Sequence, residues 1–329
     1  MTEHDILRIK SLEISLMTGH NILNGIDLTI RAGRIHGVIG ESGAGKSMIG
    51  SAIADTLPQG LEISRGAIEF DGLTLTDMNA RTRRDLLGRD IGFIPQEPMS
   101  ALNPSLTIGH QVCHHLARIG LRTAKTRQER AVELFTEVGL DRPWDLLQSY
   151  PHQLSGGMLQ RVLIAMAFAS NPRLVIADEP TTALDVTIQK KVVELIARTR
   201  AAHNTAVLFI THDLQLAADV CDDVSVLYAG RIVETGAAER IIHAPMHPYS
   251  RCLNLATPNL SGPKAQLMIL PGTMPGPVDR MQMPGCEFAL RCPLAEDQCH
   301  STRPALDGVG TEHKSACHWP ERTGSITAV

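Results

Sequence analysis

The sequence feature that most constrains the fold is Gly-Glu-Ser-Gly-Ala-Gly-Lys-Ser at residues 40–47. It fits the pattern G-x-x-x-x-G-K-[ST], in which glycines let successive backbone N–H groups turn towards phosphate oxygens. The apolar run Ile35–Ile39 precedes the loop, and apolar residues follow it at helical spacing, so the loop joins a strand to a helix. The positive end of that helix adds to the anion site. This arrangement predicts a phosphate-binding α/β fold.

The residue types in this loop indicate a nucleoside triphosphate as the ligand. The ammonium group of Lys46 can reach the β- and γ-phosphates, and the hydroxyl of Ser47 can bind Mg²⁺. The alternative, a plain glycine-rich turn, explains neither this spacing nor the position between a strand and a helix. The remaining loop residues expected to line the phosphates are Gly40, Glu41, Ser42, Gly43, Ala44 and Gly45.

A second element supplies two carboxylates. The apolar run Leu174–Ala177 predicts a buried parallel strand, and Asp178 and Glu179 follow it directly. The carboxyl ends of parallel strands lie at the edge of the sheet where phosphates bind. Asp178 suits Mg²⁺, and Glu179 suits the base that orients and polarises the attacking water. Alone, this pair equally fits a solvated strand end, but in a chain with the phosphate loop it predicts hydrolysis.

The stretch Leu-Ser-Gly-Gly-Met-Leu-Gln at residues 154–160 is the decisive signal. Ser155, Gly156 and Gly157 precede a helix with apolar periodicity, so they form another anion site at a helix start. One ATP does not need two such sites from the same subunit. Over residues 7–236, with every motif in order, the chain resembles the ABC ATPase family. The resemblance implies that Ser155 completes the ATP site of an opposing subunit in a head-to-tail dimer.

The resemblance also assigns roles to three further residues. Gln96, after the predicted strand Ile91–Ile94, corresponds to the glutamine that senses Mg²⁺ and water. Asp185 corresponds to the aspartate that follows the two carboxylates, and His212 to the switch histidine that contacts the γ-phosphate. One position departs from the family, which usually stacks an aromatic ring on adenine. Met17 and His20 are the nearest candidates here, since a thioether or an imidazole can cover a base.

The same resemblance predicts the architecture. We expect a P-loop NTPase domain over residues 1–245, with a RecA-like core, an antiparallel β subdomain and a helical signalling subdomain at about 96–154. A C-terminal extension at 246–329 follows, in which periodicity is lost and prolines recur at eight positions between 245 and 284. We expect the extension to pack separately from the phosphate loop, so that ATP binding is independent of it.

Two stretches resemble the ATPases of oligopeptide, dipeptide and nickel importers: residues 96–104 and His247-Pro-Tyr-Ser-Arg, followed by a cysteine-containing tail. In those relatives the tail is implied to hold a [4Fe–4S] cluster. By ligand chemistry alone, four thiolates also suit Zn²⁺, with His313 or His318 as substitutes, or they are merely reduced cysteines. The four candidate ligands are Cys286, Cys292, Cys299 and Cys317.

The expected function is ATP hydrolysis that energises the import of peptides. The resemblance implies two transmembrane permease subunits, a second ATPase chain that is either related or identical, and a periplasmic solute-binding protein. With no long apolar segment and no signal peptide at the start of the sequence, we expect a peripheral protein at the cytoplasmic face of a bacterial inner membrane. A net charge of −4 and 3% aromatic residues argue against nucleic acid as a partner.

Three alternatives stay open. The first is import of nickel or a nickel chelate, to which Leu159 in the glycine motif points. The second is a soluble ABC ATPase acting on DNA or ribosomes, although such proteins need a long coiled coil or a second cassette. The third is a metal-sensing regulator, against which the complete set of hydrolysis residues argues.

Overall fold

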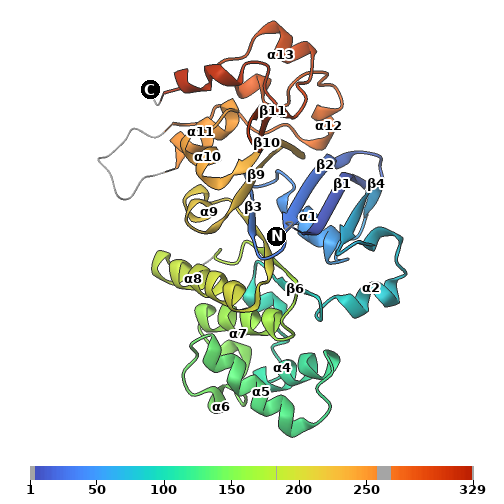
Figure 1. Ribbon diagram of the computed structural model, residues 1–329, viewed down its shortest axis with the longest axis vertical. Coiled ribbons are helices and arrows are strands. Elements are labelled where there is room, and N and C mark those ends of the chain that lie inside the picture. The colour runs from blue at the N-terminus through green and yellow to red at the C-terminus, as the bar shows by residue number, and fades with distance from the viewer. Residues whose placement is uncertain (1–3, 183, 258–267, 328–329) are drawn as a thin grey trace. The chain divides into compact units, whose positions relative to one another are not determined.

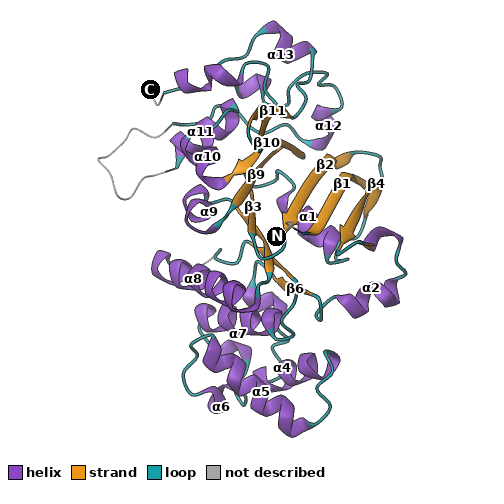
Figure 2. Cartoon of the chain, in the orientation of Figure 1, coloured by secondary structure: helices purple, strands orange, loops and turns teal. Residues whose placement is uncertain are grey.

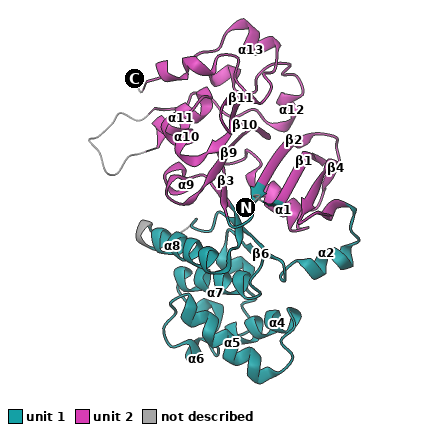
Figure 3. Ribbon diagram, in the orientation of Figure 1, with its two compact units in different colours: residues 1–6, 30–33, 77–208 teal, residues 7–29, 34–76, 209–329 magenta. Residues whose placement is uncertain are grey.

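The computed structural model describes residues 4–182, 184–257 and 268–327 (Figure 1). The chain divides into two compact units, which Figure 3 distinguishes by colour. Unit 1 comprises residues 1–6, 30–33 and 77–208, and unit 2 comprises residues 7–29, 34–76 and 209–329. Within the described residues, no helix combines the length and the apolar composition that crossing a membrane requires.

An antiparallel sheet forms the N-terminal part of unit 2, with strand order β2-β1-β4-β5 (Figure 2). Its strands alternate buried and exposed side chains, as expected for a sheet with one face in a core. These strands form the antiparallel β subdomain that the sequence predicts. The bounds are β1 Asp5–Leu16, β2 Asn21–Arg31, β4 Leu61–Phe70 and β5 Leu73–Thr74.

The second sheet of unit 2 has the strand order β11-β12-β10-β9-β3-β8. Strands β3 and β9 are parallel, whereas β9, β10, β12 and β11 pair antiparallel in turn. Every residue of β3 and β8 is buried, which explains their uninterrupted apolar composition. The bounds are β3 Ile35–Ile39, β8 Ala206–Thr211, β9 Asp223–Tyr228, β10 Arg231–Ala237, β11 Asp307–Gly310 and β12 His313–Ser315.

In unit 1, β6 and β7 are parallel and fully paired, in the strand order β8-β7-β6. Strand β8 contains the boundary between the two units, at residues 208 and 209. Residues 96–154, all described, contain helices and no strand. The elements of unit 1 are α2 Ala80–Leu86, β6 Ile91–Ile94, α3 Pro98–Ala101, α4 Ile108–Arg118, α5 Ala124–Glu137, α6 Pro143–Leu146, α7 Gly156–Phe168, β7 Leu174–Asp178 and α8 Val186–His203.

The helices of unit 2 lie mostly in its C-terminal half. They are α1 Lys46–Ile53, α9 Leu214–Val220, α10 Ala238–His243, α11 Pro248–Ala256, α12 Pro277–Arg280 and α13 Asp297–Ser301. Over both units, short 3₁₀ turns occur at Leu75–Asp77, Pro151–Gln153, Ala289–Arg291 and Pro320–Ser325.

The C-terminal extension is joined to the main sheet of unit 2. Strand β12 pairs with β10, and Glu234 of β10 is fully buried. Its carboxylate accepts hydrogen bonds from the backbone N–H groups of Met246 and His247 and lies 2.7 Å from His313 Nε2. A buried carboxylate is stable only when it is paired in this way, so Glu234 fixes the start and the end of the extension to the sheet.

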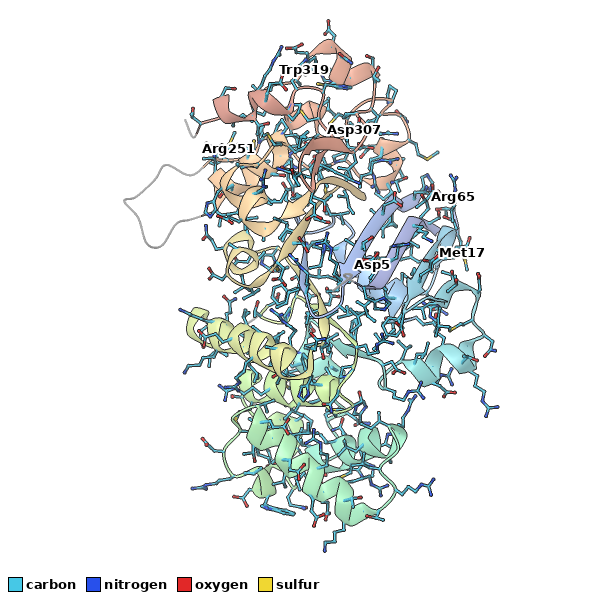
Figure 4. All side chains as sticks on the ribbon, viewed as in Figure 1. Asp5, Met17, Arg65, Arg251, Asp307 and Trp319 are labelled. Carbon is cyan, nitrogen blue, oxygen red and sulfur yellow. The ribbon has the colours of Figure 1, made fainter. Side chains whose placement is uncertain are left out.

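Aromatic packing adds to this attachment. Phe288 of the extension contacts Tyr228 of β9 and Tyr249 of α11, with ring centroids 5.2 and 5.4 Å apart. All three rings are buried. At the end of the chain, Arg251 of α11, labelled in Figure 4, donates its Nε–H to the carbonyl of Ile326. The predicted separate packing of the extension is therefore wrong, because it shares a core with the strands that carry the phosphate loop.

Candidate active site

The phosphate loop, residues 40–47, joins β3 to α1, as predicted. Gly40, Gly43 and Gly45 all have positive φ angles, of 157°, 83° and 102°. A β-carbon at Gly40 would overlap the carbonyl oxygen of Leu227 in β9, so only glycine fits there. The tight β9–β10 turn at Ala229-Gly230 supports the loop, since the N–H of Gly230 donates to the carbonyl of Ala44 at 2.9 Å.

Lys46 is 4% exposed and lies at the start of α1. Its ammonium group donates to the carbonyls of Gly40 and Glu41, at 2.9 and 3.1 Å. The loop therefore holds the lysine with its charge turned towards the loop's own backbone. A buried ammonium group held by backbone carbonyls is a strong binding group for an anion.

Residues outside the motif also hold the loop, and the sequence did not single them out for this role. The N–H of Glu41 donates to the hydroxyl of Tyr249 at 2.9 Å, and the carboxylate of Glu41 accepts from Arg291 Nη1 at 3.0 Å. Tyr249 and Arg291 both belong to stretches that mark the subfamily. Their position in these stretches marked the two residues as features of the subfamily, but it did not indicate which residues their side chains contact.

The other predicted residues of unit 2 lie on neighbouring elements. Strands β3 and β8 are adjacent in the sheet; the loop follows β3, and His212 follows β8. His212 is exposed, as a residue that contacts a ligand must be. Met17 lies at the end of β1, where Figure 4 labels it, and is 77% exposed. His20 is partly buried, with its Nδ1 3.0 Å from Thr18 Oγ1.

In unit 1 the two carboxylates lie at the end of β7, and both are nearly buried. Glu179 has a φ angle of 44°, in the left-handed region that non-glycine residues enter at a cost of about 1 kcal/mol. Its Oε2 accepts hydrogen bonds from Gln96 Nε2 at 3.1 Å and from Thr182 Oγ1 at 2.9 Å. The structure thus brings Gln96 and Glu179 together, a contact that the sequence did not predict, and adds Thr182, which the sequence analysis missed.

The glycine motif of unit 1 forms a helix start, as predicted. Ser155 is the N-cap of α7, and its side chain accepts from the N–H of Met158 at 3.4 Å. Ser155 and Gly156 are exposed. A β-carbon at Gly157 would lie 3.1 Å from Ile188 of α8, so a glycine lets the two helices approach closely. Asp185 caps α8 by accepting from the N–H of Ile188 at 3.0 Å, which places it beside the motif.

The four cysteines of the extension line one small pocket, with a cavity volume of about 20 Å³. Burial raises the pKa of the thiols of Cys286 and Cys292 to about 12 in each case. Among the described residues, no three His, Cys, Asp or Glu side chains are arranged as metal ligands. The predicted ligands therefore converge on one pocket without forming a coordination geometry. The pocket is lined by Cys286, Cys292, Cys299, Cys317, His247 and His318, among others.

The fold and these motifs define a P-loop ATPase built as an ATP-binding cassette. The family model for "ABC transporter" matches residues 23–182, and the model for "Oligopeptide/dipeptide transporter, C-terminal region" matches residues 233–299. A structure of cbiO1 from Clostridium perfringens, part of an ABC transporter complex, has a TM-score of 0.65. It is 25% identical in sequence and covers 74% of this chain and 92% of that one.

Proteins of similar sequence identify the subfamily within the ABC ATPases. The chain is 43% identical over 295 residues to the dipeptide transport ATP-binding protein DppD of Escherichia coli K12, covering 90% of both chains. It is 41% identical over 285 residues to the oligopeptide transport ATP-binding protein AppD of Bacillus subtilis, covering 86% of both. The chain belongs to the ABC transporter ATP-binding subunits of the oligopeptide and dipeptide family.

Proposed function

We propose that this chain hydrolyses ATP to energise the import of peptides through a membrane ABC transporter. The observation that best supports ATP hydrolysis is the buried Glu179 at the end of β7, which accepts hydrogen bonds from Gln96 and Thr182. The likeness to DppD and AppD over most of the chain supports a peptide as the solute. It also favours peptides over nickel, and a transporter over a DNA- or ribosome-acting ATPase.

In the proposed mechanism Glu179 polarises the water that attacks the γ-phosphate. The hydrogen bonds from Gln96 and Thr182 fix the direction of the carboxylate, which preorganises it for that role. Lys46 and the loop N–H groups hold the β- and γ-phosphates, and His212 contacts the γ-phosphate. The oxygen atoms of Ser47, Gln96 and Asp178 suit Mg²⁺, which would neutralise phosphate charge.

We propose that Ser155 and Asp185 act on ATP held by an opposing ATPase subunit. Both residues are exposed, and each caps a helix whose start carries N–H groups. A solved ABC cassette, MJ0796 bound to ADP and phosphate, is described as dimeric and covers 70% of this chain, with a TM-score of 0.63. The opposing subunit is a related chain or a second copy.

Nucleotide trapping tests this arrangement. In a complex with a distinguishable partner ATPase, Ser155→Arg should impair hydrolysis of the ATP bound by the partner's phosphate loop. Lys46→Ala should instead impair the site on this chain. Labelled nucleotide is quantified on each subunit separately. An effect of Ser155→Arg confined to ATP on its own Lys46 would contradict the dimer.

The transport complex requires further partners. We propose two transmembrane permease subunits, with this chain bound peripherally at the cytoplasmic face of the inner membrane and a periplasmic protein delivering the solute. The test is uptake into proteoliposomes that contain the assembled complex, with a labelled dipeptide and ⁶³Ni²⁺ compared. ATP-dependent accumulation of the dipeptide alone is expected, whereas accumulation of nickel alone would establish the alternative.

For the extension we propose a [4Fe–4S] cluster on Cys286, Cys292, Cys299 and Cys317. Four thiols lining one pocket fit this donor set, and deprotonation on metal binding would overcome their raised pKa. Such a cluster would be structural, since it would tie together segments separated along the chain. Zn²⁺ and plain reduced thiols are the competing assignments.

The metal content distinguishes the three assignments. Protein purified anaerobically should be brown, with about four iron atoms per chain for a four-iron centre. Loss of any of the four cysteines should remove the colour and speed proteolysis of the extension. One zinc per colourless chain would instead support Zn²⁺. Neither metal, with no effect of Cys→Ser, would support reduced thiols.

A further inference from the structure

Every polar group of Glu41 but one has a partner. Its N–H donates to the hydroxyl of Tyr249, and its carbonyl accepts from Lys46. Its carboxylate Oε2 accepts from Arg291. The other carboxylate oxygen, Oε1, is buried and has no hydrogen-bond partner within the described residues. The charge of this carboxylate is therefore stabilised chiefly by Arg291.

Arg291 is built into the extension at the end of the 3₁₀ turn Ala289–Arg291, and its side chain is 7% exposed. Its Nε donates to the carbonyl of Pro271 at 2.8 Å. Its Nη1 lies 3.3 Å from the hydroxyl of Tyr228, and the guanidinium carbon is 5.8 Å from the Tyr228 ring centre. These contacts fix the guanidinium group before any ligand arrives, so Glu41 is held by a rigid partner.

The position of Glu41 makes this pairing matter for nucleotide binding. It is the first variable residue of a loop that binds a highly charged anion, so an unpaired carboxylate there would repel phosphate. Its carbonyl is also one of the two that hold the Lys46 ammonium group. Loss of the partner would thus leave a partly buried negative charge beside the phosphates and loosen a contact of Lys46.

We propose that Arg291 is a positioning residue of the ATP site, which neutralises and fixes Glu41 and thereby sets the affinity of the phosphate loop for MgATP. This rests on the proposal that residues 40–47 bind the phosphates of ATP. Since Arg291 directly precedes Cys292, the proposal also makes the folded state of the cysteine segment a determinant of nucleotide affinity.

The test measures MgATP binding to the full chain, and KM and kcat in the assembled complex. Arg291→Met should weaken MgATP binding and raise KM about tenfold, while kcat at saturating ATP changes less than about threefold. Glu41→Gln in the Arg291→Met background should recover most of the affinity, because it removes the unpaired carboxylate. Arg303→Met is the matched control, since Arg303 pairs with Glu287 of the extension, 3.0 Å away.

A purely structural role of Arg291 predicts the opposite result for the double variant, which would then bind MgATP no better than Arg291→Met. That outcome, or an unchanged affinity of folded Arg291→Met, would overturn the proposal. If Arg291→Met does not fold, Arg291→Lys replaces it, with a smaller loss that Glu41→Gln should again reverse. Lys46→Ala tests the phosphate site separately from the role of Arg291. If this substitution leaves MgATP binding intact, the assignment of residues 40–47 as the phosphate site fails.

Discussion

At the scale of single residues, the site depends on backbone conformations that only certain side chains allow. Gly40 has positive φ and lies against Leu227, whereas Gly43 has positive φ but more space around it. A β-carbon at Gly43 would lie 3.5 Å from Met274 Cε, an ordinary contact distance. The two glycines therefore provide a matched pair for separating steric overlap from backbone strain.

Gly40→Ala should abolish MgATP binding and destabilise unit 2 by more than the roughly 1–3 kcal/mol that the strained backbone alone costs. The added methyl group must displace the carbonyl of Leu227 in β9. Gly43→Ala should cost only about 1 kcal/mol, since it adds strain without overlap. Denaturant unfolding and nucleotide titration measure both. Equal effects of the two substitutions would show that overlap with β9 is unimportant.

At the scale of secondary-structure elements, helix starts determine how the functional loops are held. Helix α11 begins after His247, whose Nδ1 accepts from the N–H of Tyr249 at 3.1 Å. Burial lowers the pKa of His247 to about 4, because the charged form is desolvated. The imidazole is therefore neutral in the folded protein, and its Nδ1 is free of a proton and able to cap the helix.

The stability of the protein should consequently fall as the pH falls from about 6.5 to about 4. In this window the unfolded chain protonates His247 at its ordinary pKa of 6.5, while the folded chain does not, so acid favours unfolding. Asparagine keeps a capping oxygen but does not titrate in this range. The His247→Asn variant should therefore show a weaker dependence of the free energy of unfolding on pH between about 4 and 6.5. Urea midpoints between pH 4 and pH 7 measure the effect. If the variant and the wild type showed the same pH dependence of stability, His247 would not be its source.

Helix α5 offers a simpler case in unit 1. Thr123 is its N-cap and accepts from the N–H of Thr126 at 3.2 Å. Thr123→Ala should cost about 1 kcal/mol, whereas Thr123→Ser should be nearly neutral, because serine caps equally well. Since the cap contacts no predicted site residue, ATP turnover per folded molecule should not change. A loss of turnover in Thr123→Ala without a loss of stability would connect α5 to hydrolysis.

At the scale of the whole molecule, local patterns predicted most of the elements. The apolar run Ile35–Ile39, the predicted strand Ile91–Ile94 and the apolar run Leu174–Ala177 are the fully or largely buried strands β3, β6 and β7. Gln96 and Glu179 each follow a strand, β6 and β7, as predicted. These features arise from burial and spacing, which a sequence displays directly.

What the sequence did not predict depends on long-range packing. Arg291 and Glu41 are 250 positions apart, and no periodicity connects an irregular, proline-rich segment to a glycine-rich loop. The composition of the extension also suggested separate packing, but the pairs around Glu234 and the ring of Phe288 join it to the sheet. Burial of a few charged and aromatic side chains thus outweighed the loss of apolar periodicity.

The central claim is that ATP hydrolysis by this chain drives peptide uptake, and Glu179→Gln tests it most directly. Glutamine has the same shape as glutamate but cannot polarise water as a carboxylate does, while Lys46 and the loop N–H groups remain. In proteoliposomes with the assembled complex, the variant should bind MgATP as tightly as the wild type. It should release no phosphate at its own site in the steady state and accumulate no labelled dipeptide. Phosphate release from this subunit and dipeptide uptake near the wild-type levels would contradict the account.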